Sequence, residues 1–594
     1  MNIFKDKFSE IKKASEPLYK SPKSVQETIE ILKISESGIF EVADGKYSKT
    51  YRFSDVNYAT RSEDEQESFF QRYCKCLNSF DCTFKITVNN KNKDMDVLRN
   101  EVMLKYRNDG FDKMRESYNR IIEEKILEGR QGIEQERYLT ITIERKNFEE
   151  AKAQFATIEA SMFRSFAELG SKLTPLTGNE RLKILHDYYR LGREDEFNFD
   201  IRQGRITGTD FRNEICNTRI KYHPDYFENE GKVGRVLFIK KYPTYLSDRF
   251  FTELTFLPVH SVTSVDVVPV PKDLTMKMLQ KKYLGIESDI IKQQRTRNRN
   301  NDFSSEISYA TRQKKKDIEE IMNNVRENDE SLYYVSVTMI VMADDRDELE
   351  SICETVDSVS KGAGCAVDTC MYKQREAVNT TLPIGVRQIE TMRTMLTQSL
   401  AVLMPFNVQE LCDRNGIYYG VNQISKNIIV GNRKKLLNGN GFIFGVSGAG
   451  KSFQAKMEMG SVLLSTDDNV IAVDPMNEYE DVTEKYNGTY INISTNTRNY
   501  INPMDMDVWN LDVLDSKGWV RDKCQFMLSI CEQIMKEITP QQRSIISRCV
   551  KDLYMDIARS REKYVPTMED LYNRLLKQED KEARDVALGL EIFV

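Results

Sequence analysis

The residues best suited to chemistry form one run, Gly445-Val446-Ser447-Gly448-Ala449-Gly450-Lys451-Ser452. This run fits the pattern of a phosphate-binding loop: glycine, four residues, then Gly-Lys and Ser or Thr. The glycines allow backbone N–H groups to turn towards an anion, and Lys451 supplies a mobile positive charge for the β- and γ-phosphates of a nucleotide. The Ser452 hydroxyl is suited to hold Mg²⁺. The run therefore predicts a site for ATP and Mg²⁺, with Lys451 as a catalytic residue.

The flanking sequence predicts the two elements that such a loop requires. Residues 441–444, Gly-Phe-Ile-Phe, are a short apolar run typical of a strand that enters the loop. Residues 453–464 have the composition of a helix. A helix that begins at the loop would add the positive end of its dipole to the phosphate site.

Two carboxylates follow the next expected strand. The apolar run 470–473 ends at Asp474, and Glu478 lies four residues further along. Ligands of open α/β sheets bind beyond the carboxyl ends of the strands, so we expect both side chains near the nucleotide phosphates. There Asp474 would assist Mg²⁺ binding, and Glu478 would orient the attacking water as a catalytic residue. The alternative is that Asp474 caps the following turn and Glu478 is solvated.

The acidic pair of a complete P-loop ATPase is not found after Asp474. Such enzymes place Asp-Glu after a second apolar strand, where the pair coordinates Mg²⁺ and polarises water. Residues 490–493 predict one more short strand, and residues 520–538 and 541–559 predict helices, the second with Thr539 as its N-cap. We therefore expect a P-loop domain truncated at its C-terminus, which leaves hydrolysis of ATP by this chain an open question.

Composition bounds the class of protein. The chain has 594 residues, of which 40% are hydrophobic and 30% charged, as in ordinary globular proteins. A net charge of −6 argues against a general coat for nucleic acids. The 11 cysteines show no disulfide framework. No run approaches the roughly 20 apolar residues of a membrane-spanning helix, so we expect a cytoplasmic protein without a transmembrane segment. Peripheral association with the inner face of the cell membrane stays open.

Strands and helices alternate in the first two thirds of the chain. Asp44-Gly45 separates two strand-like runs and predicts a β-hairpin over residues 38–53. Further strands are predicted at 84–88, 138–143, 233–240, 262–270 and 332–343. Helices are predicted at 62–78, 147–172 and 345–360. This alternation indicates an α+β domain whose sheets are covered by helices.

A polar stretch from Lys281 to Glu330 interrupts the alternation. Its basic part, residues 292–316, contains spaced arginines and the run Lys314-Lys315-Lys316. Such an arm could contact nucleic acid or an acidic partner. Nearby acidic residues, and the lack of interleaved aromatic residues, favour a solvated pair of helices that protrudes from the domain.

Several short motifs follow one another along nearly the whole chain. They are Gly38-Ile39-Phe40-Glu41-Val42, Tyr47-Ser48-Lys49-Thr50-Tyr51, Glu180-Arg181-Leu182 with Leu185-His186, Leu382-Pro383-Ile384-Gly385, Gly416-Ile417-Tyr418-Tyr419-Gly420-Val421-Asn422 with Ser425, the phosphate loop, Asp474-Pro475 with Glu478-Tyr479, and Ile501-Asn502-Pro503-Met504-Asp505. In this order they resemble the conjugative type IV secretion ATPases of the VirB-four/TraC/TrbE/CagE class, in the form carried by conjugative elements of Gram-positive bacteria.

The resemblance implies a combined α/β and α+β fold. Residues 1–385 would form an N-terminal α+β domain that docks to the secretion channel, as one unit or as two subdomains split near residue 195. Residues 386–594 would form an incomplete RecA-like domain of the HerA/FtsK kind, helical from about residue 510. The family implies other channel subunits and further copies of the chain as partners, and coupling to DNA transfer.

Three functions are compatible with these features. The first is a motor ATPase subunit that energises transfer of DNA or protein through a conjugative channel. The second is an assembly subunit that binds ATP without turnover, because the acidic Walker B region is absent. The third, a P-loop kinase for a small substrate, is disfavoured by the large region that precedes the phosphate loop.

Overall fold

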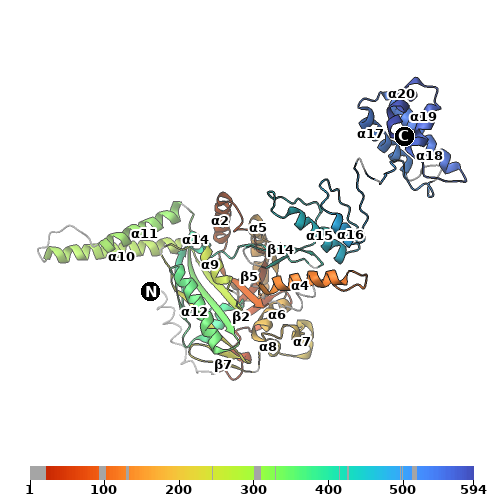
Figure 1. The fold of residues 1–594 in the computed structure, drawn as a ribbon. Coiled ribbons are helices and arrows are strands. Elements are labelled where there is room, and N and C mark those ends of the chain that lie inside the picture. Colours follow the sequence, from red (N-terminus) through yellow and green to blue (C-terminus); the bar gives the residue numbers. More distant parts are fainter. Residues whose placement is uncertain are drawn as a thin grey trace. The chain divides into compact units, whose positions relative to one another are not determined.

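The computed structural model describes residues 22–594 except 93–101, 129–132, 218, 244, 258, 300–308, 328, 414, 424–426, 495–496, 498 and 512–517. Ser425 of the sequence motifs therefore lies outside the described residues. Contacts divide the chain into two compact units, Met1–Ile471 and Ala472–Val594. Figure 1 shows the elements of each unit. The domain boundary predicted after residue 385 stays a prediction.

The first unit is built on one large sheet, which has 13 strands among the described residues. Its main path runs in the order β1 (Lys33–Ile34), β2 (Ile39–Ala43), β3 (Lys46–Phe53), β5 (Ile133–Glu144), β4 (Thr83–Asn92), β10 (Ser261–Val270), β11 (Leu332–Ala343), β9 (Lys232–Lys241), β8 (Phe227–Asn229) and β7 (Ile220–Tyr222). Three short strands pair beside this path: β6 (Leu173–Pro175), β12 (Ala366–Thr369) and β13 (Arg393–Leu396). The hairpin predicted at Asp44-Gly45 and the five further strands predicted in this region are confirmed.

Helices cover both faces of this sheet. One core contains residues of α2 (Glu63–Asn78), α5 (Phe148–Glu168), α9 (Arg249–Thr255), α12 (Arg346–Gly362) and α14 (Thr397–Ala401). The core on the opposite face contains residues of α6 (Gly178–Tyr189), α7 (Ile201–Thr207), α8 (Phe211–Ile215) and α13 (Gln374–Thr381). Strand β11 contributes side chains to both cores, because successive side chains of a strand point to opposite faces. Val337 and Met339 lie in the first core, and Ile340 lies in the second. The predicted α+β fold with a covered sheet is confirmed.

Four of the sequence motifs meet at one buried arginine, Arg181 of α6. Its guanidinium donates to the main-chain oxygens of Gly38 (2.9 Å), Ser48 (2.8 Å), Pro383 (3.2 Å) and Ile384 (3.3 Å). Burial lowers the pKa of Arg181 to about 9. These carbonyls belong to segments far apart in the sequence, so Arg181 joins them into one structure. The N-terminal motifs therefore stabilise the fold.

A pair of helices, α10 (Lys272–Arg299) and α11 (Tyr309–Glu327), projects from the sheet as an arm (Figure 1). Lys315 of α11 forms an ion pair with Glu287 of α10 at 3.0 Å and lies over the ring of Tyr283. The protruding helical pair predicted for this polar stretch is confirmed. Contact of the arm with an acidic partner stays a prediction.

A further part of the first unit lies around the phosphate loop. Between β4 and β5 the chain forms α4 (Asp112–Glu128), and after the large sheet it forms the hairpin β14 (Ile417–Val421) and β15 (Ile428–Gly431), then α15 (Lys451–Ser465). Tyr118 and Ile122 of α4 share a small core with Ile428 and Val430 of β15. Helix α4 therefore packs with the elements that carry the loop, although it ends at residue 128 and β14 begins only at residue 417.

The second unit is helical. After α16 (Glu480–Lys485) it contains α17 (Trp519–Met535), α18 (Pro540–Arg559), α19 (Met568–Leu576) and α20 (Lys581–Leu590), which share one apolar core. Thr539 caps α18 by accepting from Gln542 N, as predicted. In the Asn-Pro motif, Asn502 donates to the main-chain oxygen of Pro566 at 2.8 Å, and Met504 is fully buried in the core.

Four short 3₁₀ helices complete the described elements: η1 (Gln26–Thr28), η2 (Glu194–Glu196), η3 (Arg433–Lys435) and η4 (Glu591–Phe593). Within the described part of the chain, each helix is too short or too polar to span a membrane.

Candidate nucleotide site

The phosphate loop leads directly into α15, whose first residue is Lys451. Gly448 and Gly450 have φ of +80° and +88°, a left-handed conformation that glycine adopts without steric cost. A Cβ at Gly445 would lie 3.2 Å from both the Cβ of Ala449 and the Cγ of Lys451. Each of the three motif glycines is therefore suited to the backbone of this loop. The helix predicted at 453–464 is confirmed.

Lys451 lies across the loop that precedes it. Its Nζ donates to the main-chain oxygens of Gly445 at 2.9 Å and Val446 at 3.1 Å. An ammonium group has three donors, so one more N–H is left for a phosphate oxygen. Residues 445–451 are exposed, and Ser452 is half-buried in the first turn of α15. The exposed glycine loop, the lysine and the hydroxyl fit the phosphates of a nucleotide with Mg²⁺.

The three strands predicted around the loop, at 441–444, 470–473 and 490–493, are wrong. These residues are described, and none of them lies in a strand. Phe442 and Phe444 stack on each other at 5.7 Å, as alternate side chains of an extended chain do, and are 84% and 88% exposed. A short apolar run predicts an extended chain, but a strand also requires a neighbour for its backbone hydrogen bonds, and the run does not identify that neighbour.

Asp474 and Glu478, which belong to the second unit, lie in a turn. The Asp474 carboxylate accepts from the backbone N–H of Met476 at 3.2 Å and of Tyr479 at 2.9 Å. Partial desolvation raises the pKa of Asp474, but the hydrogen bonds from Tyr479 and Met476 outweigh it and the pKa is lowered. Glu478 is exposed. Asp474 thus caps its own turn, and the roles of both carboxylates at a nucleotide stay predictions.

Glu458 links α15 to the preceding hairpin. Its carboxylate accepts from the Tyr419 hydroxyl at 2.9 Å and from Arg433 Nη2 at 3.1 Å. Tyr419 belongs to one of the sequence motifs, whereas Glu458 and Arg433 were not singled out. Two opposite charges 25 residues apart, one of them on a predicted helix, are too weak a signal to find this contact from the sequence.

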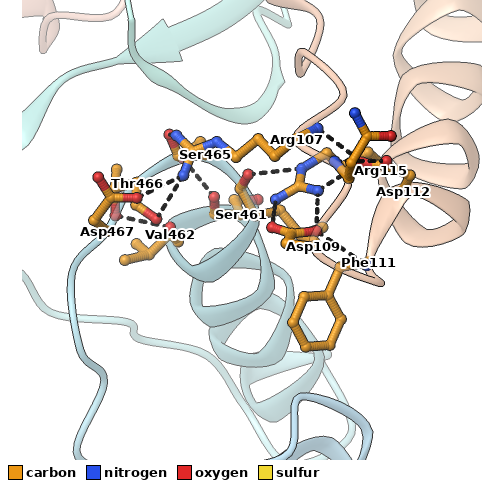
Figure 2. Close-up of polar contacts among 12 residues, drawn as sticks. Arg107, Asp109, Phe111, Asp112, Arg115, Ser461, Val462, Ser465, Thr466 and Asp467 are labelled. Carbon is orange, nitrogen blue, oxygen red and sulfur yellow. Dashed lines mark hydrogen bonds and ion pairs between the residues drawn. The ribbon is translucent and has the colours of Figure 1, made fainter.

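The other end of α15 is held by two arginines that no sequence motif identifies (Figure 2). Arg115 Nε donates to the main-chain oxygen of Leu464 at 3.1 Å, and Arg107 Nη2 donates to that of Ser465 at 2.6 Å. The one available signal was the regular spacing of Asp109, Asp112 and Arg115, three residues apart, which places these charges close together at the start of a helix.

The comparisons with known proteins bear on this region. Residues 413–586 match the family model of the TraG P-loop domain. No match was found among curated proteins. The matched range includes the hairpin β14–β15, the phosphate loop, α15, and most of the helical second unit. The resemblance to the conjugative type IV secretion ATPase family is therefore confirmed, and the chain carries a P-loop domain of the TraG type.

Proposed function

We propose that the protein is an ATP-binding motor subunit that energises the transfer of DNA or protein through a conjugative type IV secretion channel. The observation that carries this proposal is a glycine loop with Lys451 at the first position of α15, inside a match to the TraG P-loop domain. Backbone N–H groups of residues 446–452 and Lys451 would bind the phosphates, and Ser452 would hold Mg²⁺. Bound Mg²⁺ would neutralise part of the phosphate charge.

The other roles in this proposal are those expected from the sequence and from the resemblance to the family. Glu478 would orient the attacking water, and Asp474 would assist Mg²⁺ binding. Residues 1–385 would dock to other channel subunits, and residues 386–594 would act as a RecA-like motor in a homo-oligomer. Association with the inner face of the membrane would then be peripheral.

A second function is favoured by one observation. The Asp474 carboxylate is engaged by two backbone N–H groups of its own turn, and Glu478 is exposed. If neither carboxylate serves the nucleotide, the chain binds ATP and acts in assembly of the channel without turnover. Steady-state release of phosphate separates this subunit from the motor.

Binding is tested first, by titration of a fluorescent ATP analogue with Mg²⁺ into the full chain. Lys451→Ala should abolish binding and leave the melting temperature unchanged, since Lys451 is exposed and bonds only loop carbonyls. Lys485→Ala, which changes an exposed lysine of α16, is the matched control and should bind as the parent does. Equal affinity of the parent and Lys451→Ala would overturn the assignment of the site.

A further inference from the structure

We propose that Arg107 and Arg115 couple the N-terminal sheet domain to nucleotide binding, by holding the C-terminal end of the helix whose N-terminal end forms the phosphate loop. Both arginines lie in the α4 segment (residues 102–128), which is inserted between strands β4 and β5 of the large sheet. This inference rests on the proposed function, in that it assumes a nucleotide at the loop. It makes the two arginines positioning residues for that site.

The contacts are directed at the last turn of α15 (Figure 2). The final carbonyls of a helix have no partner within the helix. Arg115 satisfies that of Leu464, and Arg107 satisfies that of Ser465 while Nη1 of Arg107 forms an ion pair with Asp467 at 2.7 Å. Positive charge at this end also complements the negative end of the helix dipole. The α4 segment thus caps the phosphate-loop helix from outside.

The side chain of Arg115 is held in place by contacts within its own segment, in addition to its contact with α15. Its side chain is fully buried, and its two terminal nitrogens donate to Asp109 at 2.6 and 2.5 Å and to Asp112 at 2.7 Å. The hydrogen bonds from Arg115 hold the pKa of Asp109 below its usual range. The two carboxylates therefore stay ionised at neutral pH and orient the guanidinium so that Nε points at Leu464.

A second set of contacts holds α15 along its length. Ser461 donates to the Tyr118 hydroxyl at 3.2 Å, and both residues are buried. Met457 of α15 packs against the small core that Tyr118 and Ile122 share with β15. With the arginine contacts, these fix the position and the rotation of α15 relative to α4.

The effect on the nucleotide must be mechanical. A helix of 15 residues is roughly 22 Å long, at about 1.5 Å per residue. Charges separated by that distance are screened in physiological salt, where the Debye length is about 8 Å. The arginines therefore act on the phosphate loop through the placement of a rigid helix. A shift of α15 moves the N–H groups and Lys451 that begin it.

Coupling of this kind is reciprocal. If docking of the α4 segment strengthens nucleotide binding, the nucleotide must stabilise the docked segment by the same factor. Factors of roughly 5 to 150 are typical of such linkage. This reciprocity provides a readout that a role in stability alone would not give.

The experiment uses the full chain and a non-hydrolysable ATP analogue with Mg²⁺. Hydrogen exchange of backbone amides in residues 112–128 should slow at least 5-fold when the analogue binds. Arg115→Gln and Arg107→Gln should each weaken analogue binding about 5-fold or more and reduce the slowing of exchange by a matching factor. Arg120→Gln changes an exposed arginine of the same helix and should leave both unchanged.

The outcomes separate the two proposals. If Lys451→Ala loses binding but exchange in α4 does not respond to the analogue in the parent, the coupling is overturned and the nucleotide site stands. Parental affinity in a folded Arg107→Gln variant would also overturn the coupling, and this variant keeps the buried Arg115 cluster in case Arg115→Gln fails to fold. A parent chain that binds no analogue would overturn both.

Discussion

The guanidinium of Arg181 lies 3.9 Å from the ring centre of Phe40, over its face. A cation in this position is attracted by the negative face of the ring. The two residues belong to different sequence motifs and to different elements, α6 and β2. Their contact lies beside the four main-chain oxygens that Arg181 also binds, so this one side chain joins the first hairpin, α6 and the loop after α13.

Arg181→Met should strongly destabilise the first unit. Methionine has a similar length but no donors, so the buried carbonyls of Gly38 and Ser48 would lose the hydrogen bond from Arg181. The carbonyls of Pro383 and Ile384 would keep bonds from the Thr50 and Ser48 hydroxyls. Each unsatisfied buried acceptor costs about 1–3 kcal/mol, and a loss of about 3 kcal/mol or more in the free energy of unfolding is expected. Denaturant unfolding measures it, with Arg205→Met at an exposed position of α7 as the control. Equal stability of the two variants would contradict the role of Arg181.

Much of the N-terminal fold was predictable because its signals are local. Asp44-Gly45 specifies a hairpin, and Thr539-Pro540 specifies a helix start, within a few residues each. The order of the strands was not predictable. Strand β5 pairs with both β3 and β4, and β10 joins β4 to β11, across long separations in sequence that periodicity does not encode.

The candidate site also has a part that is predictable from the sequence and a part that is not. The phosphate loop is a contiguous motif, and its glycine conformations agree with its sequence. Arg115 and Leu464 are 349 residues apart, and no local pattern relates them. The strands at 441–444 and 470–473 were predicted from apolar runs alone, and the structure leaves Phe444 and Val473 exposed. An apolar run indicates a preference for burial, but the surface that would bury it lies elsewhere in the fold.

His260 should make the protein sensitive to acid. Burial, and to a smaller extent the charge of Lys91, lower the pKa of His260 to about 4. Neither ring nitrogen has a hydrogen-bond partner within the described structure. The unfolded chain, with an ordinary pKa near 6.5, binds more protons than the folded chain between about pH 6.5 and pH 4. Stability is therefore complete above pH 6.5 and falls by about 3 kcal/mol as the pH drops through this window.

Denaturant unfolding at pH 7.5, 6.0, 5.0 and 4.0 measures this loss. Asp187 raises the pKa of His260 and Lys232 lowers it, so both charges help to set the pH range over which stability is lost. His260→Gln cannot charge and should show a shallower decline than the parent. Parallel declines in the two proteins would assign the acid sensitivity to other groups.

A fragment of residues 1–409 should be more stable than one of residues 1–385. The backbone N–H of Asn407 donates to Asp55 at 2.9 Å, and Arg137 Nε donates to the main-chain oxygen of Pro405 at 2.7 Å. Phe406 is buried in the core that covers one face of the sheet. Ending the chain at 385 removes these groups and leaves the buried Arg137–Asp55 pair with fewer partners. Burying such a pair without its hydrogen bonds is costly.

Thermal unfolding followed by circular dichroism compares the two fragments. The longer one should unfold cooperatively, and the shorter one should melt at least several degrees lower or aggregate. A shorter fragment as stable as the longer one would show that the N-terminal domain is complete at residue 385, as the sequence predicts.

Glu478→Gln tests the proposed catalytic base. Glutamine keeps the size of the side chain but cannot accept a proton, and loss of a general base lowers turnover by roughly 10²- to 10⁴-fold. Glu478 is exposed, whereas the Asp474 carboxylate caps the turn, so Asp474→Asn would confound catalysis with local structure. Phosphate release and binding of a fluorescent ATP analogue should be measured together on the full chain. Glu478→Gln should bind like the parent and release phosphate far more slowly, while Glu484→Gln, at an exposed position of α16, should match the parent in both.

Turnover at the parental rate in Glu478→Gln would assign the base to another residue. Binding without turnover in the parent itself would favour the assembly subunit over the motor.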